Sequence, residues 1–164
     1  MEVDTIVVVN PDQRQFEDLL PQLIRIYESA YRGLPQYSDH GLAQVSDYLR
    51  WLYEGDPEGF FVALDRDLPV GFASLHSDRR GWHGDPIAEL QEVVADPDRQ
   101  GEGIGRELIH RAIRYAVEKG RDRLRLWVGE KNQRAATIYR RLGFVTLSHH
   151  GMWERMELSL ARYQ

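Results

Sequence analysis

Residues 92–108 read EVVADPDRQGEGIGREL, and this stretch is the most informative part of the chain about its fold. The apolar run 93–95 predicts the end of a strand, which the Asp-Pro pair at 96–97 stops. Three glycines spaced by single residues follow: Gly101, Gly103 and Gly105. Apolar residues then recur at helical spacing, which predicts an amphipathic helix. Its apolar side consists of Ile104, Leu108, Ile109, Ala112, Ile113, Ala116 and Val117.

A strand, a glycine-rich turn and a helix N-terminus together form an anion site. Glycines let the backbone approach a ligand and direct successive N–H groups toward it. The helix dipole and the unpaired N–H groups of the first turn add attraction for negative charge. The stretch therefore predicts a phosphate-binding loop.

Spacing separates the families that use such loops. The pattern GxxxxGK[ST] is missing, because no Lys-Ser or Lys-Thr pair follows the glycines. The pattern GxGxxG also fails, since its last position is Arg106 or Leu108. The residues match [QR]xxGx[GA] at Gln100, Gly103 and Gly105. This pattern resembles the pyrophosphate loop of the GNAT superfamily of acetyl-CoA-dependent N-acetyltransferases.

A second stretch, NQRAATIYRRLGFV at 132–145, resembles another GNAT signature, Asn-x-x-Ala-x-x-x-Tyr-x-x-x-Gly-Phe. Its fixed positions are filled by Asn132, Ala135, Tyr139, Gly143 and Phe144. Two signatures in the family's order and at its usual separation are far more specific than one glycine loop. The resemblance covers residues 55–160, whereas the first fifty residues match only in the pattern of elements.

Composition limits the remaining possibilities. A chain of 164 residues, with 42% hydrophobic and 29% charged residues, favours a single globular domain over 1–164. Apolar runs are too short for a membrane span, and the N-terminus lacks the basic region of a secretory signal, so a cytoplasmic location is expected. Cysteine is absent, which excludes cysteine nucleophiles. The net charge of −5 argues against general nucleic-acid binding and permits a cationic partner.

The order of elements predicts an α/β (α+β) fold. Strands are expected at 5–9, 60–64, 70–76, 87–95, 124–128, 144–148 and 152–160. A helix is expected at 13–31, which Pro21 interrupts with a new turn or a kink. A second helix is expected at about 39–53 with Ser38 or Asp39 as its cap. Two more are expected, one after the glycines and one over the second signature. Residues 77–86 read as a polar loop. The resemblance implies a mixed, mostly antiparallel seven-stranded sheet with helices on both faces and a splayed parallel pair, 87–95 with 124–128.

The same resemblance implies the residues that hold acetyl-CoA as co-substrate. Main-chain groups of the strand end bind the pantetheine arm, the turn binds the diphosphate, and Asn132 meets the cofactor near the pantetheine. The set is Val93, Val94, Ala95, Gln100, Gly101, Glu102, Gly103, Ile104, Gly105, Arg106, Asn132, Ala135 and Tyr139.

Candidate catalytic groups lie in the same stretches. By the resemblance, Tyr139 donates a proton to the departing thiolate, although its apolar neighbours are also compatible with core packing. A base for the amine is offered by Glu89 or Glu92, which an odd separation places on opposite faces of a regular strand unless a bulge intervenes. For each carboxylate the alternative is a solvated side chain. Some family members use no dedicated base.

The acceptor pocket is expected between the first two helices and their loop. Aromatic side chains there suit an amine by cation–π contact, and each is also compatible with packing: Tyr31, Tyr37, Trp51, Trp82 and the adjacent His83. No metal-ligand spacing is present among the histidines. The sequence thus predicts an N-acetyltransferase acting directly on a primary amine of a small molecule or peptide, with a non-catalytic acyl-CoA sensor as the alternative. A homodimer is compatible with either.

Overall fold

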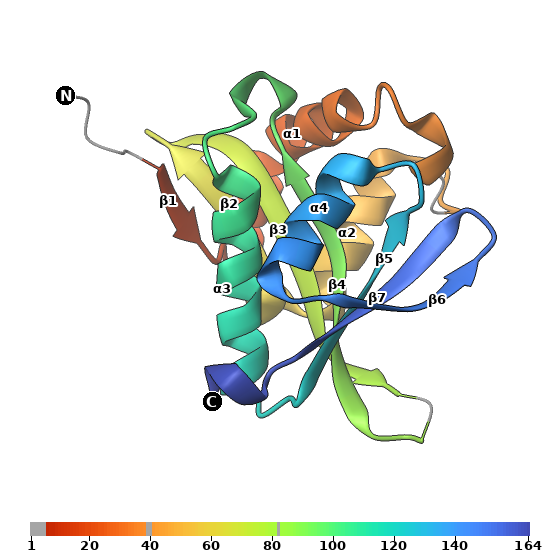
Figure 1. Ribbon diagram of the computed structural model, residues 1–164. Helices are drawn as coiled ribbons and strands as arrows, with labels where there is room; N and C mark the ends of the chain where they lie inside the picture. The colour runs from red at the N-terminus through yellow and green to blue at the C-terminus, as the bar shows by residue number, and fades with distance from the viewer. Residues whose placement is uncertain (1–5, 39–40, 82) are drawn as a thin grey trace. The chain divides into compact units, whose positions relative to one another are not determined.

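A computed structural model describes residues 6–38, 41–81 and 83–164 (Figure 1). Contacts divide the chain into two compact units. The first unit comprises Met1–Ser74 and Glu92–Ala112, and the second comprises Leu75–Gln91 and Ile113–Gln164. Strands β3 and β4 and helix α3 contribute residues to both units.

The described strands form one seven-stranded sheet in the order β1-β2-β3-β4-β5-β7-β6 (Figure 1). The strands are β1 (Ile6–Val9), β2 (Phe60–Asp65), β3 (Leu68–Arg80), β4 (Pro86–Ala95), β5 (Arg123–Gly129), β6 (Val145–His150) and β7 (Trp153–Ser159). The α-helices are α1 (Gln13–Ala30), α2 (Val45–Gly55), α3 (Ile104–Glu118) and α4 (Gln133–Leu142). Element order and the mixed, mostly antiparallel sheet confirm the predicted fold class.

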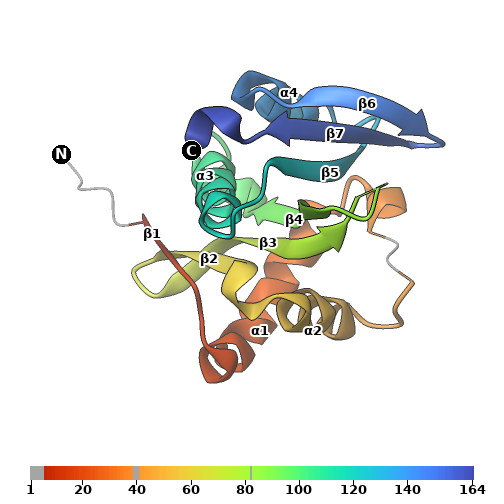
Figure 2. The ribbon, with the colours of Figure 1, turned by 90° about the horizontal axis from the view of Figure 1, so that it is seen from below.

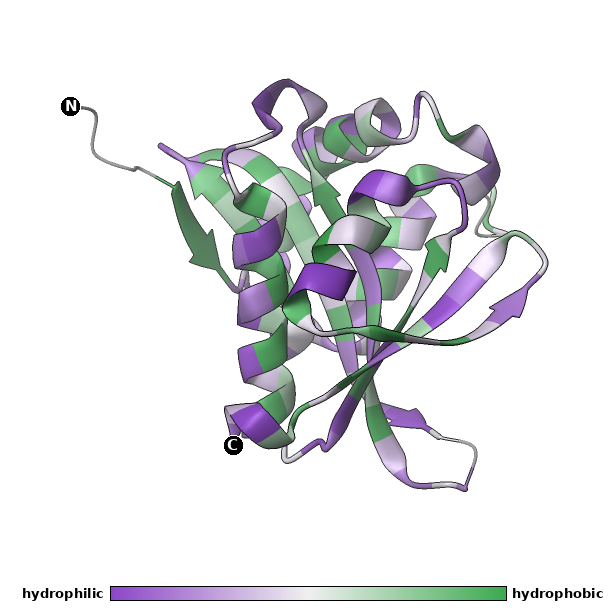
Figure 3. Cartoon of the chain, viewed as in Figure 1, coloured by the Kyte–Doolittle hydropathy of each residue, from purple (hydrophilic) through white to green (hydrophobic). Residues whose placement is uncertain are grey.

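In the first unit, helices cover both faces of the strands (Figure 2). Side chains of α1 and α2 pack on one face, against Phe60, Val62 and Phe72. On the other face, Arg111 of α3 lies over the Phe61 ring at 4.7 Å. Because side chains alternate along a strand, neighbouring residues of β2 serve opposite layers. The apolar stripe predicted for α3 is buried except for Val117, which is half-buried, and the opposite side of the helix is hydrophilic (Figure 3).

In the second unit, β5 pairs antiparallel with β7, and β7 pairs antiparallel with β6. Leu126 lies opposite Met156 in this ladder, and both side chains are fully buried. The predicted antiparallel pair at the C-terminal end of the chain is therefore confirmed.

The parallel pair β4–β5 is short. Pairing joins residues 88–90 to residues 124–126, and each strand continues past that point, β4 to Ala95 and β5 to Gly129. On its other side β5 pairs with β7 along its whole length, Arg123–Gly129. Strands β4 and β5 are therefore paired along only part of their length. This agrees with the splayed pair that the family resemblance implies.

Three local predictions were wrong. Helix α1 runs without a break from Gln13 to Ala30, so Pro21 does not start a new turn. Helix α2 begins at Val45 with Gln44 as its N-cap, since Gly41 has φ +78° and ends any helix before it. Ser38 instead follows a 3-10 turn, and Asp39 lies outside the described residues. The polar stretch 77–80 extends β3, because strand hydrogen bonds use main-chain groups whatever the side chains are.

Candidate active site

Glu92 of β4 is held by two tyrosine hydroxyls in the first unit. The Tyr31 hydroxyl, from the end of α1, donates a short hydrogen bond to Oε1. The Tyr48 hydroxyl, from α2, donates to Oε2 at 2.6 Å. Each oxygen of the carboxylate therefore has its own donor, which fixes the orientation of the side chain.

Burial raises the pKa of Glu92 to about 7, and the hydrogen bonds from Tyr31 and Tyr48 lower it by less than burial raises it. Burial and the nearby Glu92 charge raise the pKa of Tyr31 and that of Tyr48 well above 10. Both phenols are therefore protonated donors at neutral pH. Glu92 changes charge in the range where an amine base has to work.

Aromatic rings surround this carboxylate on the helix side. The Tyr27 ring lies 4.8 Å from that of Tyr31 and 5.6 Å from that of Tyr48. Trp51 stacks on Tyr48 with ring centroids 6.2 Å apart and is 44% exposed. Tyr31 and Trp51 were predicted from the sequence to line an acceptor pocket, whereas Tyr48 was missed. Its spacing of three from Trp51 on a helix was the available signal.

The other predicted pocket residues lie elsewhere. Tyr37 is buried in the 3-10 turn Pro35–Tyr37 of the first unit. His83 is exposed in the second unit, in the turn between β3 and β4. Trp82 lies outside the described residues.

The glycine turn, residues 100–105, leads from β4 to α3 in the first unit. Gly101 has φ +88° and Gly103 has φ +80°, a backbone region that L side chains rarely adopt. A Cβ built on Gly101, Gly103 or Gly105 meets no heavy atom within 4 Å, so this backbone faces open space. Among the described residues, no backbone N–H from Gly101 to Arg106 is seen to donate to another backbone group. These donors are therefore available to an anion.

Side chains of the turn differ in how far they are exposed to solvent. Ile104 is buried and anchors the start of α3, while Gln100, Glu102 and Arg106 are exposed. On the strand that feeds the turn, Val94 is buried in the core beneath α1 and α2, and Val93 and Ala95 are half-buried.

The second signature forms helix α4 with a cap at each end. The Asn132 side chain accepts from the Ala135 N–H at 3.3 Å and caps the N-terminus. At the other end Gly143 adopts φ +105°, and its N–H donates to the Arg140 carbonyl. The Phe144 N–H donates to the Tyr139 carbonyl at 3.0 Å. These two bonds are the Schellman arrangement, so the signature also has a local structural role.

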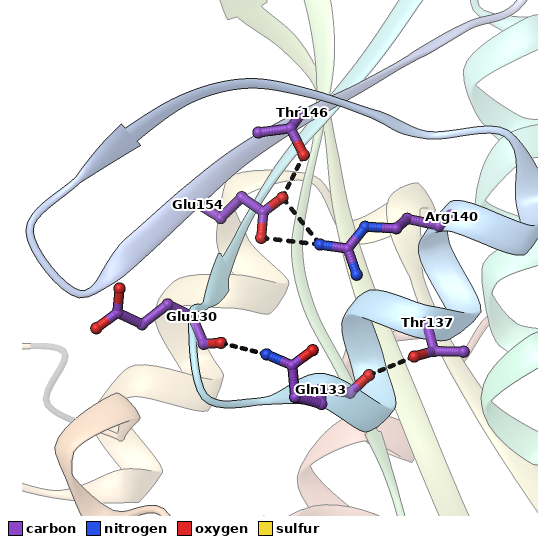
Figure 4. A network of polar contacts seen from close by, with 6 residues as sticks. All are labelled: Glu130, Gln133, Thr137, Arg140, Thr146 and Glu154. Atoms are coloured by element: carbon purple, nitrogen blue, oxygen red, sulfur yellow. Dashed lines mark hydrogen bonds and ion pairs between the residues drawn. The ribbon is translucent and has the colours of Figure 1, made fainter.

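Tyr139 is 9% exposed, and its ring lies 5.5 Å from that of Phe144. The next residue, Arg140, ties α4 to the β6–β7 ladder (Figure 4). Its Nη2 lies 3.3 Å from Oε1 of Glu154, a carboxylate that is almost fully buried. The Thr146 hydroxyl donates to the same oxygen. Helix α4 is thus fixed on the ladder by a paired charge, and Tyr139 is fixed with it.

Glu89, the other candidate base, is engaged in the second unit. Its Oε2 lies 3.5 Å from Nη2 of Arg155 and 3.9 Å from Nε of Arg79. Arg155 also lies over the Trp127 ring at 4.7 Å. Glu89 therefore has cationic partners and Glu92 has neutral ones, so the two carboxylates occupy different electrostatic environments.

Within the described ranges, no three His, Asp or Glu side chains are arranged to hold a metal ion. In that same part of the chain, no helix has both the length and the apolar character needed to cross a membrane.

Comparisons with known proteins agree with these features. The model of the acetyltransferase (GNAT) family matches residues 20–144. An uncharacterised N-acetyltransferase of Methanocaldococcus jannaschii is 35% identical over 160 residues, covering 95% of this chain and 70% of its own. A mycothiol acetyltransferase of Thermobifida fusca is 40% identical over 106 residues, covering 62% of this chain. That match covers 33% of the length of the mycothiol enzyme.

Solved structures show the same fold. PH1933 from Pyrococcus horikoshii has a TM-score of 0.83 at 33% identity, covering 94% of this chain and 98% of its own. PaiA N-acetyltransferase from Thermoplasma acidophilum, solved with coenzyme A, has a TM-score of 0.66 at 19% identity, with coverage of 94% and 98%. The chain belongs to the acetyltransferase (GNAT) family, whose co-substrate is acetyl-CoA.

Proposed function

We propose that this chain is an N-acetyltransferase that moves the acetyl group of acetyl-CoA directly to a primary amine of a small molecule or peptide. The observation that carries the proposal is Glu92, a carboxylate with a pKa of about 7 held by Tyr31 and Tyr48. An amine attacks only after its ammonium form has lost a proton, and a carboxylate that titrates near neutrality is suited to accept it.

The glycine turn fits the diphosphate of the cofactor. Its N–H groups are unpaired, its glycines leave open space, and the first turn of α3 adds the positive end of a helix dipole. Bound acetyl-CoA supplies the acetyl group as a thioester. The strand end and the turn hold it through main-chain groups, so Glu102 contributes its N–H and not its carboxylate. The residues assigned to holding it are Val93, Val94, Ala95, Gln100, Gly101, Glu102, Gly103, Ile104, Gly105, Arg106, Asn132, Ala135 and Tyr139.

Two side chains of the protein handle the protons. Glu92 takes a proton from the acceptor's ammonium group, so that the nitrogen lone pair can attack the thioester carbon. Tyr139 gives its phenolic proton to the sulfur as the carbon–sulfur bond breaks. After attack the nitrogen loses its second proton, which balances the proton that Tyr139 gave to sulfur, and Tyr139 is reprotonated through solvent. Glu92 passes its own proton to solvent, so the net products are the amide, the free thiol of coenzyme A and one proton.

Glu92 is preferred to Glu89 because of their partners. Glu89 is engaged in ion pairs with Arg79 and Arg155, which hold that carboxylate away from a new partner. Glu92 has neutral hydroxyl donors, so protonation does not break a salt bridge. With no cysteine in the chain, direct transfer is also preferred to a cysteine-linked intermediate.

The experiment begins with cofactor binding. A ligand that binds only the native state, at 100 times its Kd, stabilises that state by about 2.7 kcal/mol. For a chain of this size we expect acetyl-CoA to raise the melting midpoint by roughly 5–10 °C. ATP and NAD serve as controls. A shift with either of these and none with acetyl-CoA would refute the proposal.

Turnover is measured next, as release of free thiol from acetyl-CoA in the presence of a panel of small amines and peptides. Thiol release that depends on the amine supports the transferase. Tight binding of acetyl-CoA with no turnover on any amine would favour a non-catalytic acyl-CoA sensor instead.

A further inference from the structure

The glycine turn carries an acidic residue at its centre. Glu102 stands between Gly101 and Gly103, and its side chain is 42% exposed. A carboxylate at this position opposes any phosphate that binds the neighbouring N–H groups, because like charges a few ångströms apart repel even in a polar medium. Glu102 therefore opposes phosphate binding at the turn.

Arg99 is the cation that contacts Glu102. Its Nε donates to Oε2 of Glu102 at 2.9 Å and its Nη2 donates to Oε1 at 2.8 Å, which makes the pair bidentate. The remaining nitrogen, Nη1, donates to Oδ2 of Asp65 at 2.8 Å. The hydrogen bonds from Arg99 also lower the pKa of Glu102. All three nitrogens of the guanidinium are therefore occupied by carboxylates.

The two carboxylates hold Arg99 unequally. Asp65 is 23% exposed and ends strand β2, whereas Glu102 is 42% exposed and belongs to a turn between two glycines. An exposed carboxylate loses little when it returns to water, since exposed ion pairs contribute little net free energy. Glu102 is therefore the partner that leaves more readily, and Asp65 is the anchor.

We propose that Arg99 is a further phosphate-binding residue, a role that rests on the proposed function. Glu102 accepts the hydrogen bonds of the Arg99 guanidinium until the cofactor binds. A phosphate presents two oxygens in the same fork geometry as a carboxylate, so it can replace Glu102 on Nε and Nη2. Asp65 stays on Nη1 and keeps the guanidinium beside the turn. Glu102 competes with phosphate for Arg99 in this arrangement, and it weakens binding.

Calorimetric titration of the full chain with coenzyme A tests the competition. We expect Glu102→Gln to lower the Kd for coenzyme A by about 5- to 10-fold at low salt, with a smaller gain as salt screens the charges. The matched control is Glu17→Gln, which breaks another bidentate pair, with Arg50, at 3.1 and 3.2 Å. Its Kd should stay within a factor of two. An unchanged or raised Kd for Glu102→Gln would show that Glu102 only braces the turn, and would overturn the inference.

A second variant tests Arg99 itself. In the Glu102→Gln background, where no carboxylate of the turn competes, Arg99→Gln should raise the Kd by about 10-fold or more. An unchanged Kd there would remove Arg99 from the binding site. Circular dichroism melts of each variant check that it is folded. Titration with 3′-dephospho-coenzyme A locates the partner: the same changes assign Arg99 to the diphosphate, and their loss assigns it to the ribose phosphate.

The proposed function and the role of Arg99 and Glu102 are refuted by different results. If neither the unsubstituted chain nor Glu102→Gln binds coenzyme A, the transferase proposal is refuted and this inference with it. If the unsubstituted chain binds coenzyme A and the Glu102 and Arg99 variants bind it with the same Kd, only the role of Arg99 and Glu102 is refuted.

Discussion

The Tyr48 hydroxyl donates to Oε2 of Glu92 at 2.6 Å, although the two residues are 44 positions apart in the chain. Tyr31 makes the corresponding bond to Oε1. Helices α1 and α2 thus each deliver one phenol to the same carboxylate. The two neutral donors orient the carboxylate, while burial is the larger influence on its pKa.

The first prediction concerns the pH dependence of the rate. Glu92 accepts a proton only when it is ionised, so activity is lost as pH falls through its pKa of about 7. Below that point kcat/KM should fall about tenfold per pH unit. Glu92→Gln should lower kcat/KM at pH 8 by roughly 100-fold and flatten this limb. The measurement is a pH–rate profile of thiol release, and an unchanged profile in the variant would dismiss Glu92 as the base.

The second prediction concerns the tyrosines. Removing either hydroxyl removes a donor that stabilises the charged form of Glu92, so Tyr48→Phe or Tyr31→Phe should raise the pKa of Glu92. We expect the acidic limb of the pH–rate profile to move upward by about 1 pH unit, given the usual strength of a hydrogen bond to a charged group.

The control for the tyrosines is Tyr53→Phe. The Tyr53 hydroxyl is buried and donates to the Pro11 carbonyl at 3.0 Å, so this variant should lose stability without moving the pH–rate profile. A shift of equal size in the control would mean that the Tyr48 effect comes from general loosening of the first unit.

The contrast between the two signatures and Glu92 shows what could be predicted from sequence. The glycine turn was predicted from the spacing of its glycines, whose left-handed backbone only glycine adopts easily, whereas Gly143 was predicted only as a position of the second signature and not as a helix cap. The Tyr48–Glu92 contact depends on how α2 packs against β4. An apolar stripe predicts that a helix is buried, but not which residue of a distant strand its tyrosine meets.

The errors have the same origin. Pro21 was expected to start a new turn or kink the helix, yet α1 is one continuous helix, and buried side chains on both sides of the proline hold it in the core: Phe16, Leu20, Leu23, Ile26 and Tyr27. Packing of this kind outweighs the local cost of a proline. Residues 77–80 were read as loop from their polarity, but pairing along β3 is decided by the neighbouring strand.

The third prediction separates catalysis from binding at Tyr139. Without its hydroxyl the ring still packs against Phe144, so Tyr139→Phe should keep the fold and leave the Kd for coenzyme A within a factor of two. Loss of the proton donor should lower kcat by about 100-fold. Tyr163→Phe removes a phenol near the C-terminus and should leave kcat unchanged. Full turnover in Tyr139→Phe would reduce that residue to core packing.

The fourth prediction divides the two roles of Asn132. Asn132→Ala should lower stability by about 1 kcal/mol because α4 loses its N-cap, whereas Asn132→Ser keeps a capping oxygen and should lose only a few tenths. If Asn132 also contacts the cofactor, Asn132→Ser should still weaken coenzyme A binding. Thermal melts and calorimetric titration of the two variants measure these effects independently. Normal affinity in Asn132→Ser would leave Asn132 as a cap only.

The last prediction tests the C-terminal end of α4. Gly143 has φ +105°, and a Cβ built there lies 2.9 Å from Nη2 of Arg162, which donates to the Leu142 carbonyl. Gly143→Ala should therefore cost about 2 kcal/mol through backbone strain and displacement of Arg162, and lower the melting midpoint by roughly 4–8 °C. Gly151→Ala is the matched control, since Gly151 has φ +60° and open space around its Cβ position. The control should lose about 1 kcal/mol, from strain alone. Equal losses in the two variants would show that Arg162 yields without cost and that only the left-handed backbone requires glycine at position 143.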